Sequence, residues 1–180
     1  MFNVEKSLKG LIVLSAMTLI LSFSTAWFYR SLALKFQIES PIQLHLALAT
    51  VSVLMSMFSD TCILFYFIGT SVWIRDRSKE VFLQNRAAGK IVMQLHEKAN
   101  KLKARSFPFA TLGIGLGLFT FVLGGANQVH AIPKWLHPLL ASLLLLNALY
   151  AMKHYFFAIG ENIKILDQVS DSIEAQISKV

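Results

Sequence analysis

The sequence predicts an all-α fold, an integral membrane four-helix bundle with helical cytoplasmic extensions of the loop between spans 2 and 3 and of the C-terminal helix. Hydrophobic residues make up 55% of the 180 residues and charged residues only 15%, whereas soluble domains carry about one quarter charged residues. The apolar residues are concentrated in four runs long enough for helices to cross a bilayer. A basic segment with helical periodicity separates the second run from the third. We expect a single membrane domain covering residues 1–180.

The predicted spans cover about residues 11–29, 42–74, 107–126 and 138–158. The first run is longer than the core of a signal peptide and lacks a small-residue cleavage site, so we expect a retained helix. Pro41 suits the first turn of the second helix, where its missing N–H is no loss. A helix over 42–74 would measure about 50 Å, against about 30 Å for the hydrocarbon core. The second helix must therefore tilt or protrude.

Two amphipathic segments, 78–104 and 160–179, follow the second and fourth spans. Their apolar residues are spaced three, four or seven apart, which is typical of one face of a helix and predicts an amphipathic helix, or a pair of them, in the first segment. In the first segment this stripe consists of Val81, Ala88, Val92, Leu95, Ala99 and Leu102. In the second the positions are Ile159, Ile163, Leu166, Ser170, Ile173 and Ile177, of which only the fourth is polar. Since neither helix can bury its own stripe, we expect the two to pack together, helped by basic residues on the first and acidic residues on the second. The alternative is that the basic segment lies flat on lipid.

The positive charge sets the predicted orientation. Arg75 to Arg105 holds nine of the seventeen Lys and Arg residues, and basic loops lie on the cytoplasmic side. Both termini are then cytoplasmic. The net charge of +7 is accounted for by an anionic membrane face, so the bilayer is the expected partner and nucleic acid is not. The single cysteine, Cys62, excludes an internal disulfide and a paired-cysteine metal site.

The third span has small residues along one face, namely Gly113, Gly117, Thr120 and Gly124. Small residues let helix backbones approach closely in lipid, where no hydrophobic force drives helices together. We expect this face to pack against another helix, either in the same chain or in a partner subunit.

Asp60 is the first candidate for chemistry. A carboxylate near the middle of a membrane helix costs several kcal/mol unless it is neutral, paired or facing a polar cavity. Asn147 is the one amide near the centre of the fourth span, so a hydrogen bond between the two is one expectation. Functionally, Asp60 and Asn147 could form a proton or ion pathway. Structurally, Asp60 could be a neutral acid bonded across a helix interface, and the sequence favours this second interpretation.

His45 and His137 are the second candidates. Both fall near the outer ends of their helices, the second and the fourth. Two helices running in the same direction can place imidazoles at similar depth, as a bis-histidine haem b requires. The competing interpretation is that both are interfacial residues bonded to water or lipid headgroups.

Two stretches carry a resemblance. One is Leu64–Thr70, and the other runs from Phe121–Gly125 through Pro133 and His137 to Asn147 and 162–169. Together they resemble a group of small uncharacterised bacterial membrane proteins with four helices. The resemblance covers about a third of the chain. It implies a bacterial inner membrane and no particular activity.

Three function classes remain. The sequence favours a non-catalytic accessory or scaffold subunit, which would bind other membrane subunits or a second copy through its glycine face and amphipathic stripes. The alternatives are a small b-type cytochrome or quinone-linked electron-transfer protein through His45 and His137, and a proton or ion pathway through Asp60. The sequence contains no zinc motif, nucleophile elbow or carboxylate pair within one span, so an enzyme is less expected.

Overall fold

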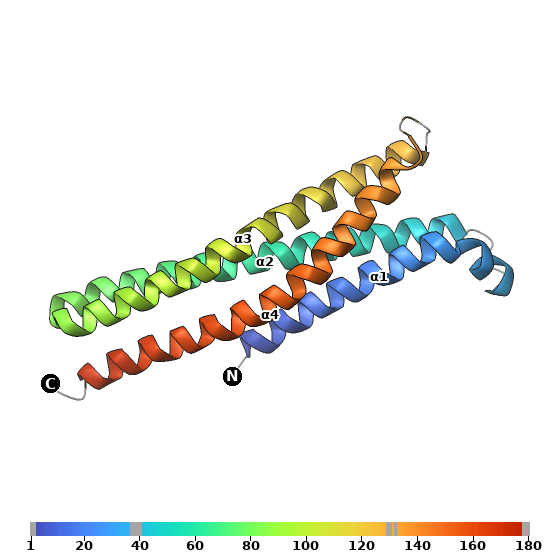
Figure 1. Ribbon diagram of the computed structural model, residues 1–180. Helices are drawn as coiled ribbons and strands as arrows, with labels where there is room; N and C mark the ends of the chain where they lie inside the picture. Colours follow the sequence, from blue (N-terminus) through green and yellow to red (C-terminus); the bar gives the residue numbers. More distant parts are fainter. Residues whose placement is uncertain (1–2, 37–40, 129–130, 132, 178–180) are drawn as a thin grey trace.

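The computed structural model describes residues 3–36, 41–128, 131 and 133–177. They form four long helices, α1 (Val4–Phe36), α2 (Pro41–Gln84), α3 (Arg86–Gln128) and α4 (Leu136–Ile177) (Figure 1). No strand occurs among these residues, so the predicted all-α class is confirmed. In Figure 1, the start of α1 and the end of α4 both lie toward the end of the bundle where α2 turns into α3.

Each of the four helices is long and apolar enough to cross a membrane. Their outward faces carry large exposed apolar side chains, such as Met17 on α1, Phe65 on α2, Phe119 on α3 and Leu146 on α4. Soluble proteins rarely expose apolar surface on this scale. These features suggest a multi-pass membrane protein.

The predicted segment 78–104 is not a separate helix. It is a hairpin, because α2 continues unbroken to Gln84 and α3 begins at Arg86. Asn85 makes the turn, and its side-chain Oδ1 accepts hydrogen bonds from the backbone N–H groups of Ala87 at 3.0 Å and Ala88 at 3.3 Å. Asparagine is among the best N-capping residues for this reason. The hairpin is tight, since a Cβ at Gly89 would lie 2.5 Å from the Cα of Phe82.

The apolar stripes of the hairpin and of the α4 tail share one core. This core contains Val81, Val92, Leu95, Ala99 and Leu102 together with Ile159, Ile165 and Val169. The face of the tail is rotated from the one the spacing predicts, because Val169 is fully buried while Ser170 is exposed. No ion pair among the described residues joins the hairpin to the tail, but Lys98 of the hairpin and Asp171 of the tail line the same hollow between them. Apolar burial is the main contact between the tail and the hairpin.

The small-residue face of α3 packs within the same chain. A Cβ at Gly117 would lie 2.9 Å from Cγ of Met57 on α2, and one at Gly124 would lie 3.1 Å from Cε1 of His137 on α4. Thr120, on the same face, is buried. The glycines therefore bring α3 close to both α2 and α4, and this surface is already covered inside the bundle.

Candidate functional site

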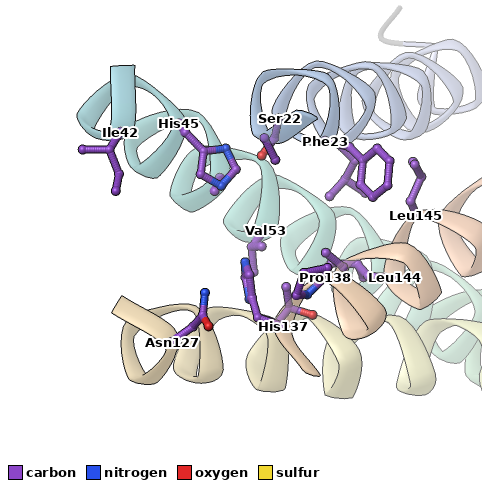
Figure 2. A pocket seen from close by; sticks show the side chains of 15 residues that line it. Ser22, Phe23, Ile42, His45, Val53, Asn127, His137, Pro138, Leu144 and Leu145 are labelled. Carbon is purple, nitrogen blue, oxygen red and sulfur yellow. The ribbon is translucent and has the colours of Figure 1, made fainter. Parts of the chain in front are cut away.

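A pocket of about 510 Å³ lies between the four helices at the end of the bundle opposite the hairpin. Most of its wall is apolar, formed by residues such as Leu19, Val53 and Leu144. Its polar lining residues are Ser22, His45, Thr120, Asn127 and His137. Figure 2 shows His45 and His137 entering from opposite walls, one on α2 and the other at the start of α4. The structure therefore brings together the two histidines that the sequence picked out.

His45 is held by a hydroxyl on α1. Thr25 Oγ1 donates to the Ser22 carbonyl at 2.8 Å and lies 3.3 Å from His45 Nδ1. Because the hydroxyl proton is already used, the geometry assigns Nδ1 of His45 as the donor to Thr25 Oγ1. The other ring nitrogen, Nε2, then keeps its lone pair. Metal-binding and ligand-binding histidines are commonly oriented by a bond of this kind to one ring nitrogen.

His137 is positioned by packing and by the backbone of Thr120. Its imidazole lies against the backbone of α3 at Gly124, where a Cβ would come within 3.1 Å of Cε1 and 3.5 Å of Nδ1. A side chain at position 124 would push the ring by a few tenths of an ångström. Nδ1 is buried and has no hydrogen-bond partner in the described part of the chain.

Unpartnered polar atoms gather in this pocket. In the described residues five buried side-chain nitrogen or oxygen atoms lack a partner, and three of them line the pocket, namely Thr120 Oγ1, Asn127 Oδ1 and His137 Nδ1. Buried polar groups are nearly always hydrogen-bonded, so such a cluster indicates a missing ligand or water. Loss of these bonds would cost about 1–3 kcal/mol for each atom.

Asp60 lies in a different place, deeper in the bundle. It is buried, and its Oδ1 accepts a hydrogen bond of 3.1 Å from the hydroxyl of Tyr155 on α4. The expected bond to Asn147 is not formed, and this prediction was wrong. Asn147 instead donates from Nδ2 to the Phe109 carbonyl on α3 at 3.1 Å. Both side chains adjoin Gly113, because a Cβ there would overlap Asp60 Oδ2 and lie 3.1 Å from Asn147 Nδ2.

Apolar layers enclose Asp60 on both sides along the bundle. Toward the pocket lie Leu19, Val53 and Leu144, which form a small buried cluster. Toward the hairpin lie Ile63, Phe67 and Ile159, each at most 1% exposed. The next polar contact comes beyond this layer, where Asn162 Nδ2 donates to the Tyr66 hydroxyl and to Thr70 Oγ1, both at 3.1 Å. Among the described residues, Tyr155 makes the one hydrogen bond to the Asp60 side chain, although Ser52, Ser56 and Ser59 of α2 are also buried near this level.

Sequence reasoning missed Tyr155 and Asn127. Tyr155 is one aromatic residue among many in the fourth span, and only the register between α2 and α4 places its hydroxyl on Asp60. Asn127 carried a weak signal, since it is a polar residue directly after the apolar end of the third span. The spacing could not show that it faces the same pocket as His137.

No known family model, curated protein or solved structure matches this chain. The described residues contain no group of three or more His, Cys, Asp or Glu side chains that could hold a metal ion. The two-histidine pocket is therefore the best-defined candidate site.

Proposed function

We propose that this chain is a membrane protein that binds a small, largely apolar molecule in the pocket between His45 and His137. The observation that carries the proposal is the coincidence of a pocket of about 510 Å³ with three buried, unpartnered polar atoms. Pockets for small molecules have about 300–1,000 Å³, apolar walls and a few polar groups that orient the ligand. A ligand here would satisfy Thr120, Asn127 and His137 together.

The proposal includes a placement in the membrane. The four apolar helices cross a bacterial inner membrane, and the hairpin, the start of α1 and the tail of α4 lie on the cytoplasmic side. The basic residues of the hairpin support this side, by the positive-inside rule. The pocket then opens in the half of the bilayer away from the cytoplasm.

Labelling of single cysteines tests this placement. In a Cys62→Ala background, Lys90→Cys on the hairpin should react with an impermeant maleimide only from the cytoplasmic side, and Lys134→Cys, near the start of α4, only from the opposite side. Both lysines are exposed. Reaction of Lys90→Cys from the outside would overturn the topology.

The two surfaces on which the scaffold hypothesis was based are covered within this chain. The glycine face of α3 is covered by α2 and α4, and the stripes of the hairpin and the tail cover each other. A subunit role would now depend on other surfaces, such as the exposed apolar residues Leu83, Ile91 and Met93 on the hairpin. It stays a prediction, and co-purification of other chains would support it.

A haem b between the histidines is a second candidate function, favoured by the entry of His45 and His137 from opposite walls of one pocket (Figure 2). It predicts a Soret absorption band in the purified protein that disappears with His45→Ala or His137→Ala. A colourless protein would exclude it.

Mass spectrometry of solvent extracts tests the ligand proposal, because it detects a bound molecule of any chemical class. The protein is purified in lipid nanodiscs, and its extract is compared with that of Ala141→Phe, which fills the pocket from α4. The matched control is Leu146→Phe, which adds a ring on the exposed side of the same helix. A molecule that is enriched in the wild type and the control but lost in Ala141→Phe supports the proposal. Identical extracts from all three proteins would contradict it.

A further inference from the structure

A ligand that partners the polar atoms in the pocket needs both hydrogen-bond donors and hydrogen-bond acceptors. Asn127 Oδ1 can only accept, whereas the Thr120 hydroxyl can donate and accept. Since an asparagine amide can turn over, its free atom can also become a donor. Thr120 is 5% exposed, so its hydroxyl has little access to water. The ligand head must therefore offer several atoms that accept or donate hydrogen bonds around its edge.

The hydrogen-bonding groups and the charge of a ligand decide which classes of molecule fit the pocket. A hydrocarbon would leave Thr120 and Asn127 without partners, and a single alcohol would satisfy one of them. A phospholipid head or the propionates of a haem bring negative charge, yet no Lys or Arg is among the described residues that line the pocket. Bringing an unpaired charge into such an apolar place is costly. A neutral ring with oxygens on opposite edges meets all of these conditions.

We infer that the pocket binds the quinone head of a lipid-soluble quinone or quinol. Thr120, Asn127 and His137 form hydrogen bonds with the ring oxygens, and the apolar wall contacts the hydrocarbon chain of the ligand. This inference rests on the proposed function and names its ligand class. A quinone presents carbonyl acceptors at both edges, and its reduced form presents hydroxyls that donate as well. Thr120 can bond either form, Asn127 Oδ1 favours the quinol, and His45 Nε2 can accept from a hydroxyl on the facing wall.

Binding of defined probes to the protein in nanodiscs tests it. The probes are a decyl-chain benzoquinone, its quinol, and a decyl-chain benzene without ring oxygens. Removal of one hydrogen bond should weaken binding about tenfold. Thr120→Val, which replaces the hydroxyl by a methyl group, should therefore weaken quinol binding about tenfold and leave binding of the benzene probe unchanged. The matched control is Thr111→Val, which removes an exposed hydroxyl bonded within α3.

The outcomes distinguish the two proposals. Equal binding of the oxygen-free probe and the quinol, or a Thr120→Val protein that binds quinol like the wild type, would overturn the quinone class while Ala141→Phe still tests the pocket. A Soret band in the purified protein would also overturn it in favour of haem. Failure of all probes to bind, with no difference between the wild type and Ala141→Phe in their extracts, would overturn the ligand proposal itself. A quinone in the wild-type extract that is lost from Thr120→Val would support both.

Discussion

The hydroxyl of Tyr155 donates a hydrogen bond of 3.1 Å to Oδ1 of Asp60, which joins α4 to α2 across 95 positions of the chain. Both residues are buried, and among the described residues the Asp60 side chain forms no other hydrogen bond. In an apolar surrounding such a bond fixes the register of two helices, because slipping either helix would leave a carboxyl group without a partner. This geometry favours the structural interpretation of Asp60 over a proton pathway.

The first prediction concerns this bond. Tyr155→Phe removes the donor and leaves the Asp60 oxygen unpartnered, which should lower the free energy of unfolding by about 1–3 kcal/mol. The measurement is reversible unfolding in mixed detergent micelles. Tyr150→Phe is the matched control, because Tyr150 is exposed on the same helix. Equal stability of the two variants would show that the bond contributes nothing.

A second prediction concerns the close packing of Gly113 against Asp60. Gly113→Ala would place a methyl group against Asp60 Oδ2 and close to Asn147, so we expect a loss of about 1–3 kcal/mol in stability. Gly115→Ala is the control, since a Cβ there meets nothing within 4 Å. In the control the added methyl group should be tolerated. The prediction fails if both alanine variants unfold at the same denaturant concentration.

The third prediction concerns the packing of His137 against Gly124. Gly124→Ala would place a Cβ 3.1 Å from Cε1 of the imidazole and push the ring by a few tenths of an ångström within the pocket. We expect the amount of bound ligand in solvent extracts to fall while the protein remains folded. Gly125→Ala, whose added Cβ meets nothing within 4 Å, should retain the ligand. Equal ligand content in the two variants would mean that the position of His137 does not matter.

The fourth prediction concerns pH and the base of the hairpin. His96 Nε2 accepts from Asn100 Nδ2 at 3.2 Å, and Asn100 Oδ1 accepts from Ser71 Oγ at 2.6 Å. Burial, followed by the positive charges of Lys103 and Arg75, holds the pKa of His96 below its usual 6.5. The unfolded chain therefore binds this proton first as the pH falls, so the contribution of His96 to stability is lost as the pH drops through 6.5.

The free energy of unfolding, measured between about pH 7.5 and about pH 5.5, tests whether stability falls with pH as predicted. The wild type should lose more stability over this range than His96→Gln, which keeps a polar side chain that does not titrate. Subtracting the two curves removes the contribution of the carboxylates, which both proteins share. Parallel curves would contradict the prediction.

Much of the fold was predictable because it follows from local rules. The stripe from Val81 to Leu102 was found from its spacing alone, and its regularly spaced members are buried or nearly so in the structure. The tail was harder, because Val169 and Ser170 are adjacent and a helix of this length drifts relative to a fixed three-and-four rhythm. Periodicity therefore gave the existence of the tail helix but misplaced its buried face by about one residue.

The amino-acid sequence by itself determined the helical class, the four apolar helices, the glycine face of α3 and the two histidines, because helix formation and apolar patterning depend on neighbours in the chain. Only the tertiary structure decided that Asp60 pairs with Tyr155 rather than Asn147, and that Thr120 and Asn127 share a pocket with His45 and His137. These relationships depend on the rotation and axial shift of one helix against another. That register is set by the sum of many side-chain contacts between distant segments, and no local spacing encodes it.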